Sequence, residues 1–205
     1  MNIPITLRKV NVNNYPVLKD FESLWNKIEQ DNNLITGRNY PNHTATWYGP
    51  VDYGYTGIRH KAQPLPVEFT KIANRLDDYL KYPKEYFNCL LINAYINKGI
   101  APHADNESIF ICKDKTIGAV ATISIGASAL VTITHNDHSK ELLFEASDAS
   151  LYVMPDGNFQ NEYKHSVSVS SGKRISLTFR HIPCRSLGGA ALRAPPKLSE
   201  RRERV

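Results

Sequence analysis

The chain has 205 residues, 41% of them hydrophobic and 22% charged, which fits one soluble globular domain and leaves little room for a second. No apolar run approaches the ~18 residues that a membrane helix needs, and the N-terminus lacks the apolar core of a signal peptide, so we expect an intracellular, cytoplasmic protein without a membrane segment. The net charge is +5, but residues 184–205 contain six basic and two acidic residues. Most of the excess charge therefore lies in this segment, and the folded body is not expected to attract phosphate in a general way.

Two amphipathic helices are predicted at residues 16–32 and 66–82. In both segments the apolar residues recur at steps of three and four, which places them on one helical face, and Pro83 ends the second pattern. Residues 37–66 are rich in Gly, Pro, Tyr and Asn, a composition that does not favour a long regular element. The aromatic side chains of this segment must pack against the protein or bind something.

From residue 87 onward the sequence changes to short alternating runs that are typical of β-strands, with turn residues between them. The eight predicted strands cover residues 87–96, 102–105, 119–126, 129–135, 141–147, 150–156, 165–170 and 174–180. Eight short strands without intervening helices predict an α+β protein that is mainly β, a double-stranded β-helix (jelly roll) with the N-terminal helices packed outside.

The last segment, residues 184–205, combines Gly, Ala, Pro and charged residues without a periodic apolar face. This composition predicts a disordered basic tail or a linker. The expected organisation is one domain at residues 1–183 followed by this tail.

His103 and Asp105 form a His-x-Asp pattern in a short extended segment, where residues two apart point to the same side. A non-haem iron(II) site needs two imidazoles and one carboxylate on one face of the metal, and His165 can supply the second imidazole from a distant strand. A rival pattern, His135-x-Asp137, lies in a polar stretch that resembles a hairpin turn, and few residues separate it from His165. His103, Asp105 and His165 are therefore the predicted metal ligands, whereas any one of these histidines alone would be an ordinary core or surface residue.

The strand at residues 174–180 places Arg174, Ser176, Thr178 and Arg180 on one side and apolar residues on the other. Two arginines on the inner face of a sheet are costly unless they meet an anion. Because the planar guanidinium group suits carboxylates, the pair could bracket a short dicarboxylate such as 2-oxoglutarate. A solvated outer face with surface ion pairs is the alternative for this strand.

Taken in order, the motifs Asn93-x-Tyr95, His103-x-Asp105-x-Glu107, Ser124-Ile-Gly126, Tyr163-x-His165 and Arg174-x-Ser-Leu-Thr-Phe-Arg180 resemble the AlkB family of nucleic-acid dealkylases. The likeness runs from about residue 46 to residue 182. Its compact spacing is similar to that of AlkB domains in the replicase polyproteins of plant RNA viruses. A linker-like tail is compatible with a place in such a polyprotein, and the site of action would then be the host cytoplasm.

This resemblance implies Fe(II) as the metal and 2-oxoglutarate as co-substrate, held by Asn93, Tyr95, Arg174, Ser176 and Arg180. It implies that Tyr53 and Tyr55, in a lid at residues 48–55, stack on a damaged base while Glu107 contacts the base edge. The implied reaction is oxidative demethylation of N-alkylated bases (1-methyladenine or 3-methylcytosine type) in methylated RNA or single-stranded DNA. Succinate, carbon dioxide and formaldehyde leave, and the protein is expected to be a monomer.

Two other functions stay open at this point. A jelly-roll oxygenase that acts on a small molecule or a protein side chain would keep the same iron and 2-oxoglutarate residues, and only the lid and Glu107 argue against it. A non-catalytic RNA-binding module of the same fold would have less reason to keep both histidines, the aspartate and both arginines.

Overall fold

The computed structural model describes residues 3–37, 42–55 and 57–183. The predicted basic tail at residues 184–205 lies outside the described residues, and the domain boundary at residue 183 stays a prediction. Within the described ranges, no helix has the length and the hydropathy of a membrane span.

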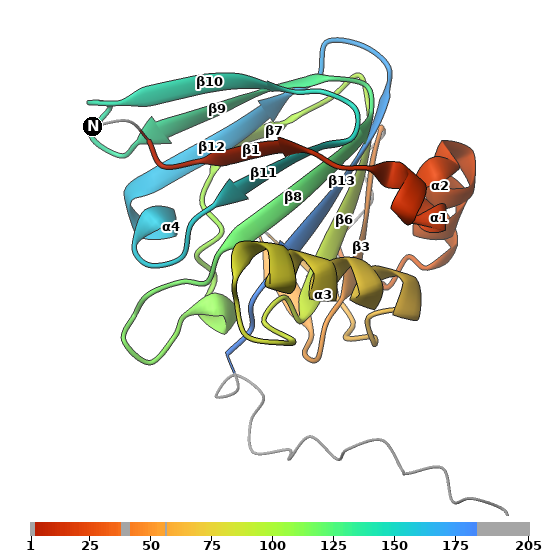
Figure 1. Cartoon of the computed structure of the whole chain (residues 1–205), viewed down its shortest axis with the longest axis horizontal. Coiled ribbons are helices and arrows are strands. Elements are labelled where there is room, and N and C mark those ends of the chain that lie inside the picture. Colours follow the sequence, from red (N-terminus) through yellow and green to blue (C-terminus); the bar gives the residue numbers. More distant parts are fainter. Residues whose placement is uncertain (1–2, 38–41, 56, 184–205) are drawn as a thin grey trace, which may run out of the picture.

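Two antiparallel sheets form the body of the protein (Figure 1). The six strands of the major sheet, in spatial order, are β1 (Thr6–Lys9), β11 (Ser150–Met154), β8 (Val120–Gly126), β13 (Lys173–Arg180), β6 (Cys89–Ile96) and β3 (His43–Tyr48). The four strands of the minor sheet are β10 (Glu141–Ala146), β9 (Ala129–His135), β12 (Tyr163–Ser168) and β7 (Ile100–His103). A small third sheet consists of β2 (Leu34–Thr36), β5 (Ile58–His60) and β4 (Tyr53–Tyr55).

The helices α2 (Phe21–Gln30) and α3 (Val67–Leu80) pack on the outer face of the major sheet (Figure 1). The first predicted helix is interrupted: α1 (Pro16–Lys19) stops before Asp20, whose side chain accepts a hydrogen bond from the backbone N–H of Ser23 at 3.0 Å. Asp20 is thus the N-cap of α2, a role that short acidic side chains favour over the helix interior. The second predicted helix is present as α3, and the short helix α4 (Phe159–Glu162) precedes β12.

All eight strands predicted after residue 87 are present, and the jelly-roll fold with external helices is confirmed. The expectation of no long regular element in residues 37–66 was wrong at β3, which pairs with β6 along six residues. The alternation of Thr44, Thr46 and Tyr48 with smaller or apolar neighbours was hidden by the Gly- and Pro-rich sequence around it.

The inner face of the major sheet is polar, and this feature positions the site. In β13, Ile175, Leu177 and Phe179 pack into the apolar core below the helices. Arg174, Ser176, Thr178 and Arg180 face the other way, yet each is at most 7% exposed. The alternative of a solvated face with surface ion pairs is therefore wrong, and the space between the two sheets contains buried polar groups.

Candidate metal centre

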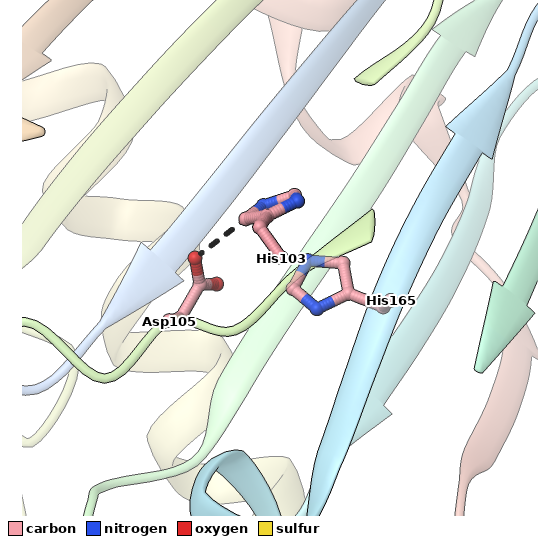
Figure 2. A group of neighbouring side chains, drawn as sticks. All are labelled: His103, Asp105 and His165. Carbon is pink, nitrogen blue, oxygen red and sulfur yellow. Dashed lines mark ion pairs between the residues drawn. The ribbon is translucent and has the colours of Figure 1, made fainter. Parts of the chain in front are cut away.

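The side chains of His103, Asp105 and His165 converge at one end of the gap between the sheets (Figure 2). His103 at the end of β7 is the direct cross-strand partner of His165 in β12, and their ring centroids are 4.2 Å apart. Asp105 follows β7 in a loop, and its Oδ1 lies 3.8 Å from Nε2 of His103. One ligand atom from each residue lies within 4.8 Å of the other two. The sheet register thus brings together residues that are far apart in the sequence.

Hydrogen bonds leave the correct atoms free for a metal. Nδ1 of His103 donates to the carbonyl of Ala101 at 2.9 Å, so Nε2 carries the lone pair. Oδ1 of Asp105 accepts from Nη2 of Arg180 at 2.7 Å, while Oδ2 is buried without a hydrogen-bond partner in the described structure. A buried carboxylate oxygen without a partner is costly, and a cation at this position would relieve the cost.

The protonation states of the buried ligands suit metal binding. Burial lowers the pKa of His165 to about 4, aided by the charges of His103 and Arg180 and opposed by Asp105. Burial alone would raise the pKa of Asp105, but Arg180, His165 and His103 together hold it below its usual value. At neutral pH the imidazole of His165 is therefore neutral and the carboxylate is ionised, as metal ligands must be.

Gln160 in α4 supports Asp105 and was not found from the sequence. Its Oε1 accepts the backbone N–H of Asp105 at 3.0 Å, and the side chain is only 1% exposed. Asp105 lies beyond the end of β7, so its N–H has no strand partner and needs this acceptor. No periodic pattern marks Gln160; the only available clue was a polar residue five positions before His165.

Replacing Gln160 with leucine is expected to weaken Mn(II) binding about tenfold or more, in the range typical of residues that orient metal ligands. The substitution keeps the side-chain volume but leaves the buried N–H of Asp105 unpaired. Metal affinity by calorimetry and thermal unfolding of the metal-free protein should be measured together. The exposed neighbour Asn161, changed to leucine, is the control, and equal affinities in the two variants would contradict the supporting role.

The rival pair lies elsewhere: His135 is the last residue of β9, and Asp137 is in the turn between β9 and β10. Nδ1 of His135 contacts Oδ1 of Asp137, whose side chain is 61% exposed, and the His135 ring packs on Tyr163. Among the described residues, the ligand atoms that lie close enough together to hold a metal ion belong to His103, Asp105 and His165, and this pair is not part of that group. The turn predicted for residues 135–139 is confirmed.

The two arginines of β13 have different surroundings. Nη1 of Arg180 donates to the hydroxyl of Tyr53 at 3.0 Å, in addition to the ion pair with Asp105. Arg174 is fully buried and donates to Oγ of Ser124 at 2.8 Å and to the carbonyl of Ala146 at 3.3 Å. No carboxylate of the described residues forms a salt bridge with Arg174, and its Nε is buried without a partner. Burial lowers the pKa of Arg174, as expected for a buried cation that has no carboxylate partner among the described residues.

A pocket of about 600 Å³ connects these groups. Its wall includes the three candidate metal ligands, and Asn93, Tyr95, Ser176 and Arg180 of the predicted 2-oxoglutarate set also line it. Arg174 is buried and is not among the lining residues. Its charge nevertheless reaches the wall residue Tyr95, where it opposes the burial that raises the pKa of the phenol. Four members of the predicted set therefore line one pocket, and Arg174 is linked to it through Tyr95.

The predicted base-binding residues line the same pocket, but the two tyrosines differ. Tyr53 is 2% exposed and packs against Trp47 and Phe110, and its hydroxyl donates to Oε1 of Glu107 at 2.7 Å. Tyr55 is half-buried and lines the pocket. Oε2 of Glu107 is buried without a hydrogen-bond partner within the described ranges. Little of the Tyr53 ring is thus available to stack on a ligand.

The chain matches one protein family over most of its length. The sequence profile of the 2OG-Fe(II) oxygenase superfamily matches residues 25–180. The chain belongs to the 2OG-Fe(II) oxygenase superfamily. For a 2OG-Fe(II) oxygenase, the metal is Fe(II) and the co-substrate is 2-oxoglutarate, and the catalysed reaction is an oxygenation.

Similar segments occur in plant virus replication proteins. The RNA replication protein of Papaya mosaic potexvirus is 31% identical over 148 residues, which are 69% of this chain and 9% of that protein. The RNA replication polyproteins of Apple stem pitting virus (isolate PA66) and Blueberry scorch virus are each 32% identical, over 62% and 67% of this chain and 5% and 7% of their own lengths. This chain therefore spans less than a tenth of the curated relatives that it matches.

The fold is that of the AlkB proteins. The solved structure of the plant AlkB homologue OsALKBH1 superposes with a TM-score of 0.59 at 15% identity, covering 88% of this chain and 99% of that one. At this identity the likeness concerns the fold. Together with the family match and the viral relatives, it confirms the AlkB-type resemblance seen in the sequence motifs.

The residues present fit the iron and co-substrate of the family. The fit rests on two features of the described residues: Oδ2 of Asp105 has no partner beside two imidazoles, and the charge of Arg174 has no anion. A divalent cation would bind the free oxygen of Asp105, and a carboxylate would neutralise Arg174.

Proposed function

We propose that this chain oxidatively removes methyl groups from N-alkylated bases, of the 1-methyladenine or 3-methylcytosine type, in single-stranded RNA or DNA. The single observation that carries the proposal is the shared pocket, in which Tyr55 and Glu107 line the same wall as His103, Asp105 and His165. RNA is the favoured polymer because the relatives are RNA replication proteins. By the same likeness, we propose action within a larger viral polyprotein in the host cytoplasm.

In this proposal His103, Asp105 and His165 hold the iron, and Arg174, Arg180, Asn93, Tyr95 and Ser176 bind 2-oxoglutarate. When bound, these two groups supply the activation of oxygen that oxidises the methyl group. Arg180 keeps Asp105 ionised and oriented, and Arg174 supplies the positive charge that neutralises a carboxylate of the co-substrate. Oxygen and 2-oxoglutarate are consumed, and succinate, carbon dioxide and formaldehyde leave.

Glu107 gives this pocket a preference for a cationic base. 1-Methyladenine and 3-methylcytosine carry positive charge near neutral pH, and the carboxylate of Glu107 has an oxygen without a partner. A charge-assisted hydrogen bond from such a base would satisfy it. Tyr53 donates to the other oxygen and thereby orients the carboxylate.

Tyr55 is the residue that we propose to stack on the base, and Tyr55→Ala is expected to slow demethylation roughly 5- to 150-fold, for a stacking energy of about 1–3 kcal/mol. Tyr55→Phe should restore much of the rate because it keeps the aromatic ring. Succinate formation without a nucleic-acid substrate should persist in both variants, since the metal ligands are unchanged.

The assay combines the protein with Fe(II), 2-oxoglutarate, ascorbate and methylated RNA or DNA oligonucleotides, and it reads the loss of each methyl group by mass spectrometry. Single strands should react faster than duplexes because extruding the base costs less. If succinate forms but no oligonucleotide loses its methyl group, a small-molecule or protein oxygenase replaces this proposal. If succinate does not form either, the chain is better explained as a non-catalytic RNA-binding module.

A further inference from the structure

His43 at the start of the edge strand β3 is part of the pocket wall but was not among the residues predicted to act there. It lies directly opposite Tyr95 of β6 in the ladder, and its ring stacks on that tyrosine with centroids 4.8 Å apart and planes at 16°. The wall next to it is formed by Asn93 and Tyr95. His43 thus contacts both neutral members of the proposed 2-oxoglutarate set that β6 supplies.

A hydrogen bond joins His43 to the side chain of Asn93. Nε2 of His43 lies 3.1 Å from Oδ1 of Asn93. Because an amide oxygen can only accept, Nε2 must carry the proton and donate it. Burial lowers the pKa of His43, with help from the charge of Lys98 and against the hydrogen bond to Asn93. The ring is therefore neutral at pH 7, and its single N–H is committed to Asn93.

In the structure this bond engages the oxygen end of the Asn93 amide and leaves its nitrogen end for a ligand. The two ends of an amide have nearly the same shape, so packing alone selects weakly between them. With Oδ1 held by the imidazole, the amide nitrogen is the end that can donate toward the pocket. An N–H group attracts a carboxylate, whereas an amide oxygen in the same place would repel it.

We propose that His43 is a positioning residue for the anionic co-substrate, which it serves by holding the Asn93 amide with its nitrogen toward the pocket. The proposal rests on the proposed role of Asn93 in binding 2-oxoglutarate. His43 itself makes no contact with iron or with the base in this arrangement.

Three substitutions separate the hydrogen bond from the packing. His43→Phe keeps a ring stacked on Tyr95 but removes the N–H. His43→Gln loses the ring but can place an amide N–H where Nε2 lies. His43→Ala removes both. The full chain loaded with Mn(II) is titrated with 2-oxoglutarate by calorimetry in the absence of oxygen, so the readout is affinity rather than turnover.

We expect His43→Phe and His43→Ala to bind 2-oxoglutarate about tenfold more weakly, as for the loss of one hydrogen bond in a buried site, and His43→Gln to bind nearly as the wild type does. In succinate formation without a nucleic-acid substrate, the change should appear in KM for 2-oxoglutarate rather than in kcat. His135→Phe is the matched control, because His135 also contacts a tyrosine ring and a side-chain oxygen but does not line the pocket. It should bind 2-oxoglutarate normally.

A packing role would reverse the order, with His43→Phe near wild-type affinity and His43→Gln impaired, and that result would overturn the proposal. Normal 2-oxoglutarate affinity in Asn93→Ala would overturn the proposal as well, because His43 could not then act on the co-substrate through the Asn93 amide. If the wild-type protein itself fails to bind 2-oxoglutarate, the proposed co-substrate site fails and this inference with it. None of these experiments measures demethylation. The test therefore stays valid even if the proposed nucleic-acid substrate is incorrect.

Discussion

The substitution His103→Ala is expected to abolish 2-oxoglutarate turnover, with succinate formation falling on the order of a hundredfold or more. The change removes one of two imidazoles from a site that offers three protein ligands, and among the described residues no third imidazole belongs to that group. Succinate is measured by mass spectrometry, and Mn(II) affinity by calorimetry gives a second readout. The His103 side chain is 34% exposed, so its loss should cost little stability.

His135→Ala is the matched control for this substitution, since it truncates the other His-x-Asp histidine. It should leave succinate formation near the wild-type level because His135 bonds to Asp137 in a surface turn. Equal losses in both variants would contradict the choice of His103 as a ligand.

Asp105 is a less suitable position for the same test. Asp105→Ala would remove the ion-pair partner of Arg180, which is buried and bonds to it at 2.7 Å. Lost activity could then reflect an uncompensated arginine rather than a missing ligand. Asp105→Asn keeps an acceptor for the guanidinium and is the better variant.

Arg180→Met is expected to lower the free energy of unfolding of the metal-free protein by about 3–5 kcal/mol, the usual cost of leaving one charge of a buried pair unpaired. Arg180 is the ion-pair partner of Asp105, and it also donates to Tyr53. Its removal leaves the carboxylate buried beside two imidazoles, without its cationic partner. Denaturant unfolding followed by circular dichroism measures the change.

Two comparisons make this prediction specific. Saturating Mn(II) should recover part of the lost stability. A cation bound to Asp105 compensates the negative charge of the carboxylate, which the missing Arg180 can no longer do. Adding Asp105→Asn to Arg180→Met should also recover stability, since the uncompensated charge is removed. A loss of stability that neither change reduces would mean that the ion pair is not its cause.

Arg174→Met is the contrasting variant from the same strand. Arg174 has no carboxylate partner among the described residues, so removing its charge should leave the unfolding free energy of the metal-free protein nearly unchanged. It should instead weaken 2-oxoglutarate binding roughly 10- to 150-fold, for a charge-assisted bond worth about 1.5–3 kcal/mol. Unchanged 2-oxoglutarate affinity would contradict the assignment of Arg174 to the co-substrate.

Local patterns in the sequence determined the secondary structure and the candidate ligands. Short strand-like runs, several of them alternating at period two and separated by turn residues, located the strands from β6 to β13. The alternation in β13 placed Arg174 and Arg180 on one face, and the two-residue spacing of His103 and Asp105 placed both on one side of an extended segment. These predictions needed only neighbours within a few positions.

The contacts that distinguish the roles of these residues were decided by the tertiary structure alone. Asp105 is 75 residues from Arg180 and 55 from Gln160, and Tyr53 is 127 residues from Arg180. No local periodicity encodes which side chains meet across two sheets. The sequence therefore gave Tyr53 and Tyr55 the same role, although one is covered by Trp47 and Phe110 and the other faces the pocket. The pairing of β3 with β6 likewise brings His43 to Asn93, because a strand's partner is fixed by the packing of the whole sheet and not by its own residues.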